Sequence, residues 1–233
     1  MPHVAFIGGA TGYTGRALVP ALRARGVEVW AHVRPDSGRL DELRQALTAD
    51  GAEVDTTAWD EAAMTDRLRQ LSPTFVFSLL GTTRKRAKSE GRDAQAAYEA
   101  VDYGLTMLLY RATAAGAPQA RFVYLSAAGL GDDPSNPYMN VRWRVEQALT
   151  AGDTPYTIVR PSFITGPDRE GRPMERAGAV VADGLLSVVG ALGGRGLAAR
   201  YKSLTATQLA EGIAREVLQP ESAGKILHTE DLR

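Results

Sequence analysis

His3-Val-Ala-Phe-Ile-Gly8 runs directly into Gly9-Ala-Thr-Gly12-Tyr-Thr-Gly15-Arg16, so that a short apolar run ends in a turn containing three glycines. Glycine has no Cβ, which lets such a turn adopt unusual dihedrals and lets a diphosphate approach the main chain closely. Apolar residues at helical spacing follow from Ala17 onward, and a helix starting here would point unpaired N–H groups at the turn. The pattern predicts a dinucleotide-binding strand, turn and helix, the alternative being the same elements without a ligand. The cofactor contacts predicted from this turn are Gly9, Thr11, Gly12, Tyr13, Thr14 and Gly15.

The amino-acid composition excludes or disfavours several classes of function. The 233 residues are 44% apolar and 23% charged, which predicts one large single-core domain over residues 1–233. A net charge of zero favours neither nucleic acid nor an anionic membrane as partner. The absence of cysteine excludes disulfides and thiolate chemistry, and three scattered histidines argue against a metal site. The chain enters its first predicted strand at once and contains no apolar run of membrane-spanning length, so we expect a cytoplasmic protein.

Short apolar runs alternate with helical patterns along most of the chain. This alternation predicts an α/β fold with a doubly wound parallel sheet, a Rossmann fold. Beyond Pro161 the alternation weakens, and we expect residues 162–205 to form a small cap over the substrate. A helix near 205–218 and a last strand from Lys225 follow it. The other strands are predicted near 3–8, 28–33, 53–55, 75–80, 121–125 and 156–160, and the other helices near 14–25, 39–49, 60–71, 93–115 and 138–150.

The end of the second predicted strand indicates which nucleotide is bound. In dinucleotide folds an acidic residue there accepts from the ribose 2′-hydroxyl, whereas a cation pairs with a 2′-phosphate. Here Arg34 comes first, and its guanidinium fork suits a phosphate, while Asp36 lies beyond Pro35 in a turn-forming sequence. The sequence favours NADP(H) over NAD(H), although Arg34 could also be a solvated cation at the strand end.

Five motifs, taken in their order along the chain, resemble those of a known family. The chain resembles atypical short-chain dehydrogenases/reductases over nearly all of residues 3–233, and within them the Tat-interacting-protein-like branch, with biliverdin-reductase-B-like proteins more distant. The resemblance implies a Rossmann fold and bound NADP(H). The motifs are the glycine turn at 9–15, Leu80-Gly-Thr-Thr-Arg84, Leu125-Ser-Ala-Ala-Gly129, Tyr138-Met-Asn-Val-Arg142 and Val159-Arg-Pro161.

The resemblance also implies catalytic roles. The family uses a tyrosine as general acid/base, a lysine four residues later and a serine that orients the substrate, which map to Tyr138, position 142 and Ser126. Residues four apart share one helix face, so a cation there can lower the pKa of the phenol. Position 142 is Arg142, which supplies charge and can hold ribose hydroxyls but does not readily release a proton. The alternative is that these residues only begin a helix and cap a strand.

Further cofactor contacts are expected at the strand ends. The resemblance places the backbone of Leu80 and Gly81 along the cofactor and the segment with Pro161 and Phe163 beside the nicotinamide. Thr82 follows the fourth predicted strand, at the edge where open parallel sheets bind ligands. Asp55, ending the third predicted strand, is expected to meet the adenine. Arg142 is the last of the predicted cofactor contacts.

The leading interpretation is an NADP(H)-dependent oxidoreductase acting on a small carbonyl or hydroxyl compound, as a monomer or homodimer. The basic run from Arg84 to Arg92 could attract an anionic substrate, or be a solvated loop. The alternative function is a non-catalytic NADP(H)-binding redox sensor or interaction protein, which Arg142 motivates. A sugar-nucleotide epimerase is disfavoured because few residues follow the sixth predicted strand.

Overall fold

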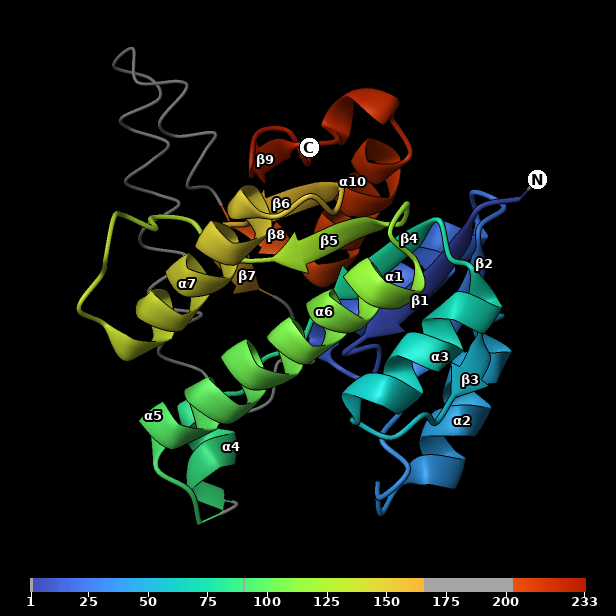
Figure 1. The fold of residues 1–233 in the computed structure, drawn as a ribbon, viewed down its shortest axis with the longest axis horizontal. Helices are drawn as coiled ribbons and strands as arrows, with labels where there is room; N and C mark the ends of the chain where they lie inside the picture. The colour runs from blue at the N-terminus through green and yellow to red at the C-terminus, as the bar shows by residue number, and fades with distance from the viewer. Residues whose placement is uncertain (1, 90, 166–202) are drawn as a thin grey trace.

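A seven-stranded parallel sheet organises the molecule (Figure 1). The computed structural model describes residues 2–89, 91–165 and 203–233. The strand order is β3-β2-β1-β4-β5-β6-β9, so the order of strands reverses direction between β1 and β4. Ligands of open parallel sheets bind beside such a reversal, outside the carboxyl ends of the strands. The strands are β1 (Val4–Gly8), β2 (Glu28–His32), β3 (Glu53–Asp55), β4 (Phe75–Ser78), β5 (Arg121–Leu125), β6 (Tyr156–Arg160) and β9 (Lys225–His228).

Helices cover both faces of the sheet, because alternate residues of each strand point to opposite sides. Ala5 and Ile7 of β1 pack in one core with α1, α2 and α10, whereas Phe6 packs in a second core with α3, α6 and α7. The first layer is α1 (Tyr13–Arg23), α2 (Leu40–Ala49) and α10 (Ala206–Val217), and the second is α3 (Glu61–Leu71), α6 (Thr106–Gly116) and α7 (Pro137–Ala151).

The predicted fold class is confirmed, and most predicted elements end within two residues of the observed ones. One difference lies in the helix predicted over 93–115, which is divided into α5 (Ala94–Ala97), the π-helix η1 (Tyr98–Leu105) and α6. These three form one continuous rod in Figure 1. The basic run considered as a solvated loop instead forms a short helix, α4 (Arg84–Ser89).

The predicted substrate cap falls mostly on residues 166–202, outside the described residues. At its two ends the strands β7 (Ile164–Thr165) and β8 (Leu204–Thr205) pair in parallel as a separate small sheet. A 3₁₀ turn, η2 (Pro220–Ser222), precedes β9. Within the described part of the chain, no helix has the length and apolar character needed to cross a bilayer.

Candidate functional site

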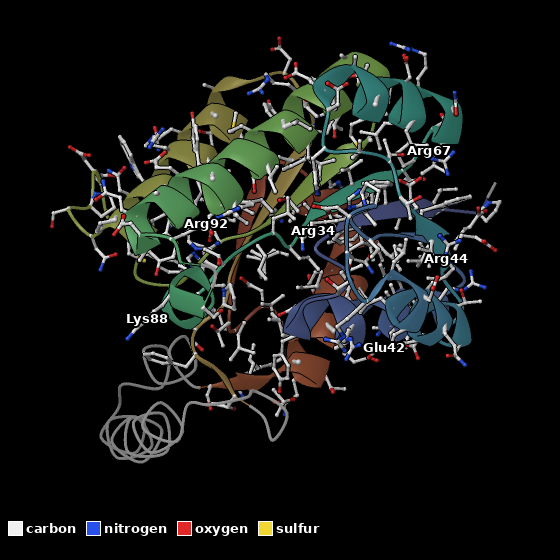
Figure 2. The ribbon with its side chains drawn as sticks, turned by 90° about the horizontal axis from the view of Figure 1, so that it is seen from below. Arg34, Glu42, Arg44, Arg67, Lys88 and Arg92 are labelled. Atoms are coloured by element: carbon white, nitrogen blue, oxygen red, sulfur yellow. The ribbon has the colours of Figure 1, made fainter. Side chains whose placement is uncertain are left out.

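A cavity opens at the carboxyl edge of the sheet, beside the reversal of strand order. Its walls come from the glycine turn after β1, the ends of β2 and β4, the loop after β3 and the π-helix η1. In Figure 2 Arg34 and Arg92 are the labelled residues of this region. The lining residues are Gly9, Thr11, Gly12, His32, Arg34, Trp59, Leu79, Leu80, Gly81, Thr82, Arg92, Val101 and Leu105.

The three glycines of the turn serve different purposes. Gly9 has a φ of +86°, and a Cβ there would lie 2.6 Å from the Leu79 carbonyl oxygen. A Cβ on Gly15 would lie 2.3 Å from the Gly9 carbonyl oxygen, so packing of the turn itself requires these two glycines. Gly12 lines the cavity and would bring a Cβ no closer than 3.3 Å to another heavy atom. Gly12 is therefore less tightly enclosed than Gly9 and Gly15.

Gly12 is also the N-cap of α1. It has no side chain to accept from the first N–H groups, and no acidic residue occurs in the first turn of the helix. A helix N-terminus of this kind attracts anions. Thr11 lines the cavity, but Tyr13 and Thr14 do not: the Tyr13 hydroxyl donates to the Thr165 carbonyl oxygen at 3.2 Å, and Thr14 is buried.

The end of β2 supplies a cation and a neutral ring. Arg34 lines the cavity with half of its side chain exposed, and its Nε lies 3.7 Å from Asp36 Oδ1. His32 is buried, and this burial lowers its pKa although the Thr57 carbonyl, 2.7 Å from Nε2, opposes the shift. His32 is therefore neutral at physiological pH, and Arg34 is the cation at this strand end.

Asp55 is placed differently from its expected contact with adenine. Its Oδ1 accepts from Thr57 N at 2.9 Å and its Oδ2 from Arg67 Nε at 2.5 Å. Burial opposes ionisation, but these hydrogen bonds and the Arg67 charge together lower the pKa of Asp55. Both carboxylate oxygens thus hold the loop after β3. That loop presents Trp59, which sequence reasoning missed, to the cavity, with its ring 4.5 Å from the His32 ring.

A buried carboxylate holds the loop after β4. Leu80, Gly81 and Thr82 line the cavity as expected, and Thr82 N donates to Asp102 Oδ2 at 2.9 Å. Asp102 lies in η1, and burial raises its pKa to about 6 although the neighbouring Arg142 charge opposes the shift. The sequence pattern gave no signal for Asp102, because its partners come from two other segments of the chain.

Arg142 lies beneath this loop rather than at the protein surface. Its Nη2 donates to Asp102 Oδ1 at 3.2 Å and its Nη1 to the Leu125 carbonyl oxygen at 2.7 Å. Burial disfavours its charge, but the nearby Tyr138, Tyr124 and Asp102 together raise the pKa of Arg142. Its Nε is buried without a hydrogen-bond partner among the described residues. Arg142 is a permanent, fixed positive charge with one unused donor.

Tyr138 lies one helical turn from Arg142 at the start of α7, where Asn136 caps the helix by accepting from Tyr138 N at 3.0 Å. The Arg142 guanidinium carbon lies 4.5 Å from the centroid of the Tyr138 ring. The cation expected four residues after Tyr138 therefore lies against its ring, as a cation–π contact. Tyr98 of η1 packs edge-on against the same ring, with the centroids 5.5 Å apart.

Ser126, expected to orient a substrate oxygen, is hydrogen-bonded to another side chain of the protein. Its hydroxyl donates to Glu146 Oε1, and Glu146 also pairs with Arg160 Nη2 at 2.5 Å. Ser126 and Glu146 are both buried. A hydroxyl has a single proton to donate, so the role expected for Ser126, orienting a substrate oxygen, would require this network to open.

The segment after β6 contains two of the predicted cofactor contacts, Pro161 and Phe163. Pro161 is buried, and its carbonyl oxygen accepts from Ala128 N at 2.9 Å. Phe163 is 61% exposed, and its carbonyl oxygen accepts from Leu204 N at 2.9 Å. Neither residue lines the cavity. Their predicted contact with the nicotinamide stays a prediction.

Comparison with known proteins establishes the family. A sequence profile described as NAD(P)H-binding matches residues 9–187. The chain belongs to this NAD(P)H-binding family. It is also 30% identical over 190 residues to the mitochondrial protein fmp52-1 of Aspergillus terreus, covering 78% of this chain and 75% of the relative. The match to mitochondrial fmp52 of Aspergillus clavatus is 32% identical and covers 76% of this chain and 73% of the relative.

Solved structures agree on the fold. A short-chain dehydrogenase/reductase from Serratia marcescens superimposes with a TM-score of 0.65 at 17% identity, covering 97% of this chain and 95% of the other. UDP-glucose 4-epimerase from Brucella ovis, solved with NAD, gives a TM-score of 0.65 at 17% identity and covers 98% of this chain and 77% of the other. The predicted membership of an NAD(P)H-binding family is confirmed by the sequence profile, and the predicted Rossmann fold by these structures.

The relatives correct one expectation. We expected a cytoplasmic protein from the beginning of the sequence, but the four curated relatives are all mitochondrial proteins. The expectation is wrong, because a first strand that starts early in the sequence and the lack of a membrane-spanning apolar run do not determine the compartment in which a protein works.

The arrangement fits the cofactor of the family. Gly12 lines the cavity at the N-terminus of α1, and two arginines line it as well. Arg142 Nε is a buried donor with no partner among the described residues. The helix N-terminus and the two arginines suit the phosphate groups of a dinucleotide. The chain therefore carries an NAD(P)H-binding site at this edge of the sheet.

Proposed function

We propose that the protein is an NADP(H)-dependent oxidoreductase acting on a small carbonyl or hydroxyl compound. The observation that carries this proposal is the Arg142 guanidinium, 4.5 Å from the centre of the Tyr138 ring. The same guanidinium shares Asp102 with the loop that lines the cofactor cavity. These contacts connect Tyr138 through Arg142 and Asp102 to the loop that lines the cavity, and they support Tyr138 as the general acid/base of the proposed reaction.

The charges of the cavity support NADP(H) as the cofactor. None of the described lining residues is acidic, and Arg34 stands at the strand end that meets the ribose in this fold. An acidic residue would be required there to bind a free 2′-hydroxyl. We expect Arg34→Ala to weaken NADPH binding about 10- to 100-fold, the value of one charge-assisted hydrogen bond, and to leave NADH binding nearly unchanged. Calorimetric titration with both nucleotides measures this.

In the proposed reaction Tyr138 exchanges a proton with the substrate oxygen. Bound NADP(H) supplies or accepts the hydride. The hydrogen bonds from Arg142 to Asp102 and to the Leu125 carbonyl hold its guanidinium against the Tyr138 ring. Arg142 does not relay the proton, because a guanidinium stays protonated in proteins. Ser126 is left out of the proposed step because it donates to Glu146.

Removal of the Tyr138 hydroxyl tests the proposal. A panel of aldehydes and ketones is screened for oxidation of NADPH, and Tyr138→Phe is compared with the wild type on any substrate turned over. We expect kcat/KM to fall about 10²- to 10⁴-fold with unchanged NADPH affinity, as for loss of a general acid. Tyr98→Phe is the matched control, since it removes a hydroxyl from the ring packed against Tyr138. Full activity of Tyr138→Phe would rule out the mechanism.

A second candidate function is a non-catalytic NADP(H)-binding sensor or interaction protein. The network of Ser126, Glu146 and Arg160 favours it, because the hydroxyl expected to orient the substrate is bonded within the protein. This function requires tight NADPH binding, no turnover on the panel and a protein partner whose capture depends on the cofactor. Capture that is the same with and without NADPH would exclude it.

A further inference from the structure

The cofactor cavity has a second arginine that neither the family motifs nor the proposed catalytic step uses. Arg92 follows α4 and lines the cavity together with the glycine turn. It is far from Arg34 in sequence and comes from a different side: in Figure 2 Arg34 lies by the end of β2 and Arg92 by the helical segment after β4. Lys88 of α4 lies farther out in the same view.

The charges around the glycine turn leave a diphosphate without a cation of its own. The N-terminus of α1 contributes about half a positive charge, whereas a diphosphate carries two negative charges. Arg16, the cation nearest the turn in sequence, is not among the residues that line the cavity. Arg34 stands where the ribose is expected. Among the described lining residues, the second cation is Arg92, which shares the cavity with the glycine turn.

Local structure holds Arg92 at this position. Arg92 N donates to the Ala87 carbonyl oxygen at 2.8 Å, which closes the turn after α4. The next residue, Asp93, caps α5 by accepting from Gln95 N at 2.9 Å and Ala96 N at 3.1 Å. The backbone of Arg92 is thus fixed between two helices, so only its side chain has to be ordered when a ligand binds. Preorganisation of this kind reduces the entropy lost on binding.

We propose that Arg92 binds the diphosphate of the dinucleotide, opposite the N-terminus of α1. The inference rests on the proposed function and deepens it: Arg34 reads the 2′-phosphate and so sets the choice between NADPH and NADH, whereas Arg92 contacts a group that both nucleotides share. Arg92 therefore contributes affinity without selectivity.

Calorimetric titration of the full chain with NADPH and with NADH tests the division of roles. We expect Arg92→Ala to weaken binding of both nucleotides by the same factor, about 10- to 100-fold, so that their ratio of affinities stays at the wild-type value. Arg34→Ala changes that ratio. Arg92→Lys keeps a charge and recovers part of the loss. Lys88→Ala is the matched control, since it removes an exposed cation of the same segment that does not line the cavity.

Every other outcome contradicts either the role inferred for Arg92 or the proposed function. If Arg92→Ala leaves both affinities unchanged, or lowers that of NADPH alone, the diphosphate role is wrong while the proposed function stands. If Lys88→Ala lowers both affinities as much as Arg92→Ala, the effect is one of general charge and the inference fails. If the wild type binds neither nucleotide, the proposed function fails together with the inference. Circular dichroism of each variant verifies that the fold is retained.

Discussion

At the glycine turn, Gly15 is required for packing, whereas Gly12 is expected to matter for ligand binding. A Cβ at position 15 would lie 2.3 Å from the Gly9 carbonyl oxygen, whereas at position 12 its nearest heavy atom would be 3.3 Å away. We expect Gly15→Ala to lower the free energy of unfolding by more than about 2 kcal/mol, as backbone displacement does. Gly12→Ala should cost less than about 1 kcal/mol yet lower NADPH affinity at least tenfold. Urea unfolding and calorimetry measure the two effects, and equal destabilisation by both variants would contradict the distinction.

Asp102 makes stability depend on pH. Burial raises its pKa in the folded state to about 6, above the ordinary value of about 3.9 expected in the unfolded chain. The folded state therefore holds this proton more tightly, and the contribution of Asp102 to stability is full below about pH 4 and is lost as the pH rises to about 6.

The variant Asp102→Asn cannot ionise and should lack this contribution. We expect the difference in unfolding free energy between variant and wild type to change between pH 4 and pH 6 in favour of the variant, and to be constant above about pH 7. Urea titrations at several pH values measure it. A difference that does not vary with pH would show that Asp102 titrates normally.

At the scale of elements, α10 depends on its first turn. Thr205 Oγ1 accepts from Gln208 N at 3.1 Å, and the Gln208 side chain accepts from Thr205 N at 3.0 Å, which together form a capping box. The helix then buries Leu209 and Ile213 in the core that it shares with α1. Thr205→Ala should lower the unfolding free energy by about 1 kcal/mol.

A neighbouring threonine provides the control for this prediction. Thr207 is exposed on the same helix and does not serve as its cap. Thr207→Ala should change the unfolding free energy by less than about 0.5 kcal/mol. Equal effects of the two substitutions would mean that the capping box adds nothing beyond helix propensity.

The π-helix η1 is the element with the largest functional consequence. A π-turn inserts an extra residue into a helix and often occurs at functional sites. Here η1 places Asp102 within hydrogen-bond distance of Thr82 N and Arg142 Nη2, and it packs Tyr98 against Tyr138. The same element also contributes Val101 and Leu105 to the cavity wall. It therefore connects the proposed catalytic tyrosine to the cofactor loop.

For the whole molecule, ligand binding should raise thermal stability. A ligand that binds only the folded state at a hundred times its Kd adds about 2.7 kcal/mol, which for a chain of this size raises Tm by about 5–10 °C. We expect NADPH to give such a shift by differential scanning fluorimetry, with a smaller one in Arg92→Ala. Free nicotinamide, which lacks phosphates, is the control and should give none. No shift with NADPH at saturating concentration would contradict a preformed site.

The sequence by itself determined the architecture, because its signals are local. Alternating apolar runs and helical patterns predicted the parallel sheet, and the glycine turn predicted the edge of the sheet at which the cavity opens. The end of β2 likewise identified Arg34 as a cavity residue. Each of these inferences needs only residues that are neighbours along the chain.

Only the tertiary structure decided the partners of the charged side chains. Asp55 bonds to Arg67, Ser126 to Glu146, and Arg142 to Asp102, which is 40 residues away. Arg92 and Trp59 enter the cavity because the loops after β4 and β3 fold over the same strand ends. Burial and ion pairing depend on which segments meet in space, and several partners of either charge are available to each group along the chain. The sequence pattern can therefore name the titratable groups but not the ones that face each other.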